Sequence, residues 1–298
     1  MPAAARPALS RRIALSAPDL SARIERLFVY PIKSCAGVEL SEAILTETGL
    51  DLDRAWMVVD DKGEYVTQRE LPRMALVRPQ LKFHEVVLRA PGMLALHLQI
   101  DTVEEPSRVR IWDEEVAAFD MGGVAAQWFS DFLGRKLRLV RFDPDHRRLS
   151  SRKWTGGVEA LNQFSDGFPL LVASQASLDQ LNEKLAAQGH VPVGMERFRP
   201  NIVLSGIEAH DEDRVDMFEV AAAQPVRLRP VKPCGRCPIP DIDPATAEVD
   251  PVIGDTLRTY RRNDLLDGAI SFGMNLVIAD GVDQTLKVGQ AVTANYRF

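Results

Sequence analysis

The feature that most constrains the fold of this chain is a series of short apolar runs, each of strand length, that follow one another closely in its first half. IERLFVYPI (24–32) combines β-branched and aromatic residues and ends near a proline. RAWMVVDDKGEYVTQR (54–69) has two such runs around an Asp-Lys-Gly turn, which is typical of a β-hairpin. Further runs are MALVRPQLKF (74–83), EVVLRA (85–90), LALHLQI (94–100) and SRVRIW (107–112). Strands this close together, without intervening helices, predict a barrel or a sandwich.

Two segments have the pattern of helices. VAAQWFSDFLGR (124–135) is closed by Gly134, and SQASLDQLNEKLAAQG (174–189) begins at the capping residue Ser174 and stops at Gly189. Strand-like runs then return: NIVLSGI (201–207), MFEVAAA (217–223), PVRLRPV (225–231) and MNLVIAD (274–280). The predicted fold class is therefore mainly β with a few helices (α+β), built as two β-barrel-like domains.

The domain division is expected near residues 144–156, where the chain is polar and has little periodicity. We therefore expect a flexible leader over 1–23, an N-terminal domain over 24–145 and a C-terminal domain over 146–298. The leader has no apolar stretch long enough for a signal peptide or a membrane span, so a cytoplasmic protein without a membrane partner is expected.

The charge of the chain limits its binding partners. A net charge of −6 and a pI near 5.5 argue against a protein that coats nucleic acid, because such a protein needs a basic face. Any anion bound here must meet a local cluster of positive charge. The three cysteines are too few, and odd in number, for a disulfide framework, so we expect free thiols.

Two of these thiols, Cys234 and Cys237, lie three residues apart in RPVKPCGRCPIPDID (229–243). They could be incidental loop thiols. A structural zinc site would need four ligands, and the remaining Cys35 and the scattered histidines do not have the required spacing. A thioredoxin-like dithiol would start a helix, which the prolines after Cys237 oppose. A single thiolate that ligates a soft metal or carries sulfur, beside the cations Lys232 and Arg236, is the fourth alternative, and composition alone leaves the choice open.

Several motifs, in this order along the chain, resemble those of MOSC proteins: YPIKSCAG (30–37), LDRAWMVVD (52–60), VTQRELPR (66–73), ERFRPNIVLSG (196–206), KPCGRCPIPDIDPATAE (232–248), LRTYRR (257–262) and LKVGQAV (286–292). The resemblance is to the branch that pairs an N-terminal MOSC β-barrel with the MOSC domain, which includes the mitochondrial amidoxime-reducing component and its bacterial relatives. It implies a molybdenum cofactor in its molybdopterin form, with Cys237 as the protein ligand of the metal and as the catalytic residue. A thiolate suits a metal that is already bound by sulfur, and Cys234 is then only a neighbour.

The same resemblance implies a cradle for the anionic cofactor. Lys33 and Ser34 would contact phosphate from a loop, while Arg54 and Arg199 would donate to phosphate or pterin. Asp166, in FSDGFPLL, would accept hydrogen bonds from the pterin ring. The further members share only a match in position, proximity to the cysteines or a place at a helix start: Ser174, Asn201, Arg236, Arg69 and Arg261.

The function that follows from the resemblance is the reduction of N-hydroxylated compounds such as amidoximes, hydroxylamines or N-hydroxylated bases. Electrons are expected from a separate protein, a ferredoxin or a flavoprotein reductase, because the chain has no four-cysteine ferredoxin segment. A proton donor is also needed, and Asp241 and Asp243 qualify only by proximity to Cys237.

Two alternatives remain open. The first is sulfur carriage through a persulfide on Cys237; MOSC domains also occur fused to cofactor sulfurases, and that link keeps pyridoxal phosphate binding as a secondary expectation. The second is a cofactor carrier without catalysis.

Overall fold

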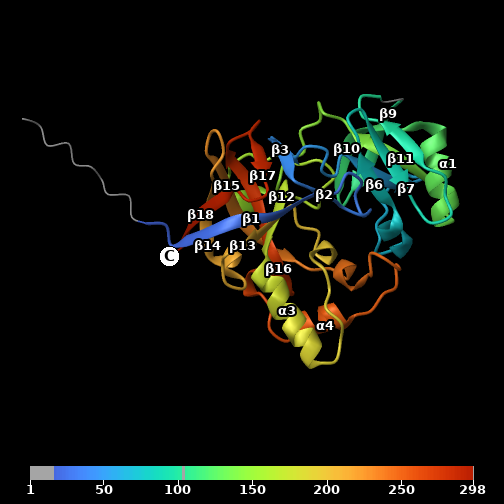
Figure 1. Cartoon of the computed structure of the whole chain (residues 1–298). Coiled ribbons are helices and arrows are strands. Elements are labelled where there is room, and N and C mark those ends of the chain that lie inside the picture. Colours follow the sequence, from blue (N-terminus) through green and yellow to red (C-terminus); the bar gives the residue numbers. More distant parts are fainter. Residues whose placement is uncertain (1–16, 103–104, 298) are drawn as a thin grey trace, which may run out of the picture.

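A ring of seven hydrogen-bonded strands forms the larger part of the molecule (Figure 1). The computed structural model describes residues 17–102 and 105–297. β1 (Leu20–Val29) pairs with β13 (Ile202–Ser205) on one side and with β18 (Ala291–Tyr296) on the other, which closes the sheet on itself. The ring continues through β12 (Leu170–Ser174), β16 (Ser271–Asp280), β15 (Val226–Gly235) and β14 (Val215–Val220), and β2 (Val38–Leu40) extends it beyond β1.

The interior of the ring is filled by the apolar residues of its strands. In β1, Leu20, Ala22 and Ile24 are buried, whereas the residues between them are exposed. This alternation is the pattern of a strand with one face toward a core and one toward water. The ring is therefore a packed barrel rather than an open channel.

The N-terminal part of the chain builds two small sheets on either side of one helix. α1 (Gly122–Leu133) buries Trp128, Phe129 and Phe132 in a core that both sheets share. One sheet contains β5 (Trp56–Asp60), β11 (Leu137–Phe142), β10 (Glu114–Asp120) and β9 (Glu105–Ile111), and the other contains β6 (Arg78–Leu81), β7 (Glu85–Arg89) and β8 (Leu96–Gln99). A third small sheet joins β3 (Glu42–Thr46) and β4 (Gly49–Leu50) to the distant β17 (Thr285–Lys287).

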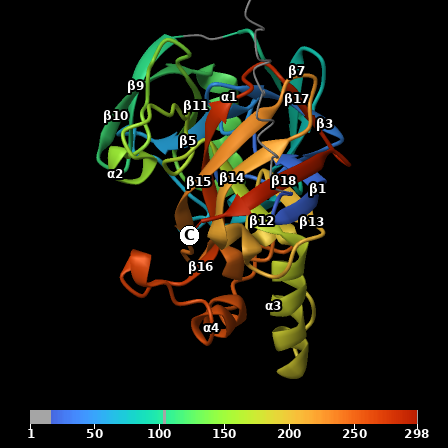
Figure 2. The same ribbon diagram turned by 90° about the vertical axis from the view of Figure 1, so that its left-hand side faces the viewer.

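The other helices lie outside the barrel. α3 (Gln175–Ala187) and α4 (Val252–Arg258) pack together at the end of the barrel farthest from α1, as Figures 1 and 2 both show. Leu178, Leu181 and Leu185 of α3 are buried there against the barrel and α4. α2 (Arg152–Thr155) is a single turn between the two parts of the chain. No helix in residues 17–102 and 105–297 is long and apolar enough to cross a membrane.

The predicted fold class is confirmed, and the differences from the expected elements have local causes. Residues 74–76 belong to a 3-10 turn, η1 (Pro72–Leu76), because Pro72 occupies its first position and starts the turn. α4 was not expected, since its seven residues follow a proline-rich stretch. β12 was not predicted, because every one of its residues is buried and its sequence therefore shows no alternation of apolar and polar residues.

The expected leader over 1–23 needs a correction at its end, because β1 already begins at Leu20; residues 1–16 lie outside the described part of the chain. The division into 24–145 and 146–298 remains a prediction. Strand pairing crosses it, since β1 completes the ring formed by strands of the C-terminal half.

Candidate functional site

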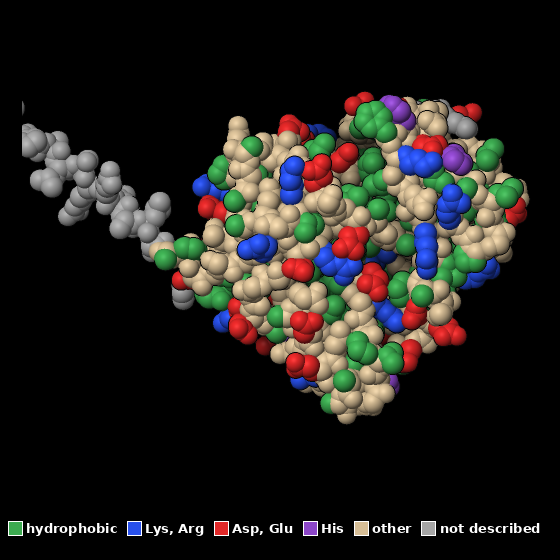
Figure 3. Space-filling model, in the orientation of Figure 1, with side chains coloured by type: hydrophobic (Ala, Val, Ile, Leu, Met, Phe, Trp, Pro, Cys, Tyr) green, Lys and Arg blue, Asp and Glu red, His purple; other side chains and the backbone are tan. Residues whose placement is uncertain are grey.

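A cavity of about 530 Å³ is lined by residues from both halves of the chain. Seven of its lining residues are lysine or arginine and two are aspartate, although the whole chain carries a net charge of −6. On the face shown in Figure 3, by contrast, acidic and basic side chains are interspersed. Most of the predicted site residues line this cavity: Lys33, Ser34, Arg54, Arg69, Asp166, Arg199, Asn201, Arg236 and Cys237.

Backbone hydrogen bonds fix the loop that carries Lys33 and Ser34. The Lys33 amide donates to the Trp56 carbonyl (2.8 Å), and the Arg54 amide donates to the Tyr30 carbonyl (2.9 Å). Ser34, Arg54 and Arg199 all have left-handed backbone angles, with φ of 67°, 51° and 58°. Such conformations cost energy in residues other than glycine and concentrate at functional sites, so their occurrence around one cavity makes it the candidate functional site.

Tyr30 is the platform for two of the arginines. The guanidinium carbons of Arg54 and Arg199 each lie 4.3 Å from the centre of the Tyr30 ring, which is fully buried. Gly37 makes room for this ring, because a Cβ atom at that position would lie 2.5 Å from it. A buried aromatic face can hold two like charges close together by cation–π attraction. Asp53 pairs with Arg54 (2.6 Å), so Arg199 is the arginine of this pair that has no carboxylate partner among the described residues.

Arg199 keeps an unused hydrogen-bond donor. Its Nη1 donates to the Cys35 carbonyl (2.6 Å), whereas its buried Nη2 has no partner among the described residues. Burial, and then repulsion from Arg54, lower the pKa of Arg199 to about 10. A buried unsatisfied donor next to another cation is unfavourable, and an anion in the cavity would relieve both effects.

Lys33 and Asp166 form an ion pair of 2.5 Å across the cavity, and Lys33 also donates to the Phe164 carbonyl (2.9 Å). Burial lowers the pKa of Lys33 against the attraction of Asp166. The cavity walls raise the pKa of Asp166, but the charge and hydrogen bond of Lys33 outweigh them and lower it to about 2. The carboxylate, whose side chain is 70 % exposed, is therefore ionised at neutral pH and favours the charged form of Lys33.

Arg148 holds the loop that carries Asp166. Its Nη1 donates to the side chain of Asn162 (2.6 Å) and to the carbonyls of Gln163 and Ser165 (2.7 Å each), and Glu114 accepts from its Nε. Arg148 is itself buried. Arg148 lies in the polar segment 144–156, where the domain division was expected, and it holds a loop of the site in place.

The cysteine loop begins where β15 ends at Gly235. Arg236 donates to the Cys234 sulfur (3.0 Å) and to the Phe198 carbonyl (2.8 Å). Cys234 and Cys237 are both half-buried and line the cavity. Cys35 is fully buried, and burial raises the pKa of its thiol to about 12, so it is not a candidate ligand. No cluster of three or more histidine, cysteine, aspartate or glutamate side chains that could hold a metal ion occurs in the described residues.

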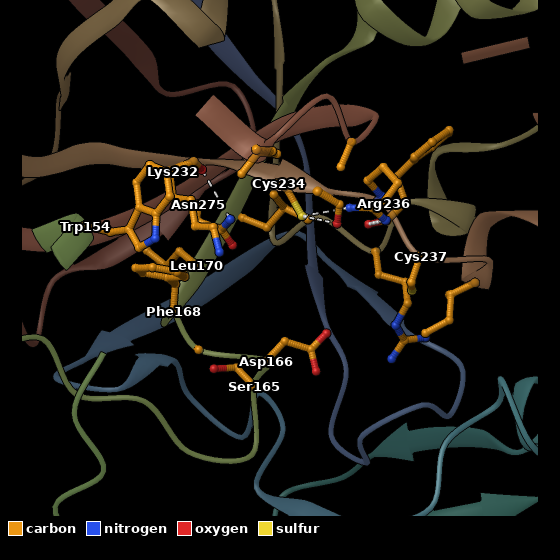
Figure 4. Close-up of a pocket in the computed structure, with 18 of the residues that line it drawn as sticks. Trp154, Ser165, Asp166, Phe168, Leu170, Lys232, Cys234, Arg236, Cys237 and Asn275 are labelled. Carbon is orange, nitrogen blue, oxygen red and sulfur yellow. Dashed lines mark hydrogen bonds between the residues drawn. The ribbon is translucent and has the colours of Figure 1, made fainter. Parts of the chain in front are cut away.

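The residues that line the cavity form two groups, which we call its cationic end and its aromatic end. The cationic end consists of Lys33, Arg54 and Arg199. The aromatic end is formed by Trp154, Phe168, Leu170, Lys232 and Asn275, and Cys234 lies between this group and the labelled Arg236 and Cys237 (Figure 4). Sequence reasoning gave the aromatic end no role: Trp154 lies on a single turn without periodicity, and only the position of Phe168 two residues after Asp166 could have indicated it.

Two predicted site residues lie away from this cavity, and a third lines it with its polar groups already bonded to the backbone. Ser174 and Arg261 do not line this cavity. Ser174 caps α3 by accepting from the Ser177 amide (3.1 Å), and Arg261 pairs with Asp213. Asn201 does line the cavity, but its amide group bridges the backbones of Phe28 and Leu171. Their polar groups therefore hold the barrel together.

Asp241 and Asp243 also have structural partners. The Asp241 carboxylate accepts from the Gly254 amide (2.8 Å), and Asp243 pairs with Arg197 (2.9 Å). Neither lines the cavity, which supports loop stabilisation as their role.

Comparison with known proteins agrees with this arrangement. Residues 21–136 match the model of the MOSC N-terminal beta barrel domain, and residues 160–293 match that of the MOSC domain. Human mitochondrial amidoxime reducing component 2 is 34 % identical over 253 residues, which are 81 % of this chain and 73 % of that protein. Human mitochondrial amidoxime-reducing component 1 is 32 % identical over 286 residues, 90 % of this chain and 82 % of that protein.

Human molybdenum cofactor sulfurase is 27 % identical over 276 residues, which are 86 % of this chain but only 30 % of that protein. Both domain matches and the length shared with these relatives lead to one family assignment. The chain belongs to the MOSC family, within the group that contains the mitochondrial amidoxime-reducing components.

Proposed function

We propose that this protein is a molybdenum-cofactor-dependent reductase of N-hydroxylated compounds such as amidoximes, hydroxylamines and N-hydroxylated bases. The observation that carries the proposal is the cavity in which Lys33, Arg54 and Arg199 meet Cys237, although these residues are widely separated in sequence. Its excess positive charge suits a phosphate-bearing cofactor, and its half-buried thiol suits a soft metal.

The residues of the cavity divide the work of holding such a cofactor. Ser34 and the third N–H of Lys33 would donate to phosphate, since the other Lys33 contacts go to Phe164 and Asp166. Arg54 and the unpartnered Nη2 of Arg199 would donate to phosphate or pterin. Asp166 would accept from pterin N–H groups. Arg69 and Arg236 line the same space and add positive charge.

Cys237 would be the single protein ligand of the metal and the catalytic residue. The chemistry that the cofactor supplies when bound is a two-electron reduction of the N–O bond, which with two protons gives the reduced nitrogen compound and water. The chain supplies position and charge. Asp166 is ionised at neutral pH and therefore holds the Lys33 proton rather than donating one to the substrate.

Electrons would come from a separate protein, a ferredoxin or a flavoprotein reductase, and we propose a cytoplasmic location. The matched relatives named amidoxime-reducing components support the reaction class, because they are more than 30 % identical over most of this chain.

The test is elemental analysis of protein produced in a host that makes the cofactor. We expect molybdenum and released pterin near one equivalent each, and reduction of benzamidoxime to benzamidine with reduced methyl viologen as electron donor. Protein that contains the cofactor but reduces neither benzamidoxime nor any other N-hydroxylated compound would be a carrier, and the reductase proposal would be wrong.

Sulfur transfer is a second candidate, favoured by the match to molybdenum cofactor sulfurase and by the contact of Arg236 with the Cys234 sulfur. In this case a persulfide on Cys237 would pass its outer sulfur to an acceptor, and the pyridoxal phosphate chemistry that generates the persulfide would belong to a partner protein. Purified protein with sulfane sulfur and no molybdenum would support this candidate over the reductase.

A further inference from the structure

The aromatic end of the cavity contains two lysines, Lys153 and Lys232, that form no ion pair with the residues the structure describes. Lys232 Nζ lies 5.2 Å from the centre of the Trp154 ring and 6.0 Å from that of Phe168, and Lys153 Nζ lies 5.5 Å from the Trp154 ring. Within the described part of the chain neither lysine has a carboxylate at ion-pairing distance, whereas Lys33 pairs with Asp166. Both lysines therefore lie over aromatic rings rather than against a carboxylate, and their ammonium groups remain available to an anionic ligand.

The position of Lys232 is fixed by the strand that leads to the cysteine loop. Asn275 donates to the Lys232 carbonyl (3.2 Å), which ties β15 to β16 at this point. Three strand residues separate the Cα atoms of Lys232 and Gly235 by about 10 Å, and Cys237 follows two residues later. A benzene ring with substituents on opposite carbons, held at one end by the lysine side chain, is long enough to reach from Lys232 to the cysteine loop.

The two ends of the cavity suit different ligands. The cationic end offers hydrogen-bond donors in fixed positions. The aromatic end offers apolar surfaces, from the half-buried Phe168 and Trp154 and the buried Leu170, and two ammonium groups. Flat rings stack on aromatic side chains, and a lysine recognises a carboxylate or phosphate as a point charge without bidentate geometry.

From this arrangement we propose that the aromatic end is a substrate subsite that selects N-hydroxylated compounds with an aromatic ring and an anionic group. The ring would lie against Trp154 and Phe168, the acid group would meet Lys232 with Lys153 at the rim, and the N–O group would point toward Cys237. The orientation of the N–O group toward Cys237 rests on the proposed reductase function. Binding to the subsite can be tested without the reaction.

The kinetic test uses three substrates with the cofactor-loaded protein and reduced methyl viologen: 4-carboxybenzamidoxime, benzamidoxime and acetamidoxime. We expect kcat/KM to fall in that order. In Lys232→Met the ratio of kcat/KM for the carboxylated over the neutral aromatic substrate should fall about tenfold, the size of one lost charged hydrogen bond. Lys232→Arg should restore the ratio, and Lys62→Met, an exposed lysine in the turn after β5, is the matched control and should not change it.

The ring contribution is tested by Trp154→Leu. This variant should reduce kcat/KM about fivefold or more for both aromatic substrates relative to acetamidoxime, because the stacking surface is lost. Molybdenum content is measured for every variant. A parallel loss of cofactor in Lys232→Met and Trp154→Leu would assign the aromatic end to the cofactor and overturn the proposal.

A binding measurement separates this inference from the proposed function. By calorimetry, the product analogue 4-amidinobenzoate should bind more tightly than benzamidine, and Lys232→Met should remove about tenfold of that affinity. If the protein reduces no amidoxime but binds 4-amidinobenzoate with this dependence, the subsite stands and the reductase function falls. If it reduces amidoximes with equal preference for charged and neutral rings, the subsite proposal is wrong and the function stands.

Discussion

Two polar clusters in this protein, one at the cavity and one behind α3, differ in the sign of their charge and in their access to a cavity. The cavity cluster, Lys33, Arg54, Arg199 and Asp166, has more positive than negative charge and an unpartnered arginine donor. The cluster behind α3, which we call the α3 cluster, consists of Ser174, Ser177, Glu212, Asp213 and Arg261.

The members of the α3 cluster bind mainly one another. Glu212 accepts from the Ser174 amide (3.2 Å) and the Ser177 hydroxyl (2.9 Å), and Arg261 pairs with Asp213. The α3 cluster contains two carboxylates and one arginine, and Glu212 Oε2 and Asp213 Oδ1 have no partner among the described residues. The cavity cluster has an excess of the opposite sign and adjoins an open cavity of about 530 Å³. The comparison teaches that unpaired buried atoms alone do not mark a ligand site, and that an adjoining cavity with an excess of one charge is also needed.

The largest expected effect is at the sulfur beside the cavity cluster. Cys237→Ser should reduce benzamidoxime reduction by more than about a hundredfold, because a hydroxyl is a poor ligand for a soft metal. Circular dichroism and thermal unfolding should show a retained fold. Cys234→Ser is the matched control in the same loop and should keep most of the activity; equal loss in both variants would favour a dithiol function instead.

The next prediction distinguishes the two clusters, because a substitution in one should change molybdenum content and a substitution in the other should change the free energy of unfolding. Arg199→Ala should lower molybdenum content per folded molecule about tenfold, since two of its donors and its stacking on Tyr30 disappear. Arg261→Ala should instead lower the free energy of unfolding by about 3 kcal/mol, because Asp213 is left mostly buried without its partner.

The exposed Arg108→Ala is the control for both measurements and should change neither. Cofactor loss in Arg261→Ala at full stability would break the distinction between the clusters.

A pH dependence of stability should belong to the α3 cluster. Burial, and then the charge of Asp213, raise the pKa of Glu212 to about 7, well above the value of about 4.3 for an unfolded chain. The folded state therefore holds this proton more tightly. Its contribution to stability is complete below about pH 4 and declines as the pH rises toward 7.

Glu212→Gln keeps an oxygen acceptor for Ser174 and Ser177 and has no charge to bury. Relative to the parent protein it should gain roughly 1–3 kcal/mol between pH 5 and pH 8, measured by urea unfolding. The exposed Glu208→Gln serves as the control. An identical pH profile for parent and Glu212→Gln would mean that the carboxyl is not the source of the dependence.

The difference between the clusters also explains how far the sequence could predict the site. Motif resemblance identified Lys33, Ser34, Arg54 and Arg199, and the structure brings them to one cavity. It failed for Ser174 and Arg261, because a residue's partner decides its role and the partners are distant: Glu212 is 38 positions from Ser174, and Asp213 is 48 from Arg261.

The fold shows the same limit. Alternating strands such as β1 and capped helices such as α3 were predictable, since their patterns are local. The closure of the ring by β1 was not, because it depends on pairing with β13 and β18 from the other half of the chain. The aromatic end was missed for a related reason: Trp154 and Lys232 meet only in three dimensions.

The smallest effect concerns Ser174, the predicted cofactor residue that the structure places at a helix start. Its hydroxyl caps α3 through the Ser177 amide and is fully buried, so Ser174→Ala should lower the free energy of unfolding by about 1 kcal/mol. Ser151 is a matched control, because it stands at the start of α2 without a side-chain cap and should tolerate alanine. Molybdenum content per folded molecule should be the same in both variants and the parent. A loss of cofactor in Ser174→Ala at unchanged stability would return this residue to the cofactor site, and the α3 cluster could then no longer be treated as independent of the cavity.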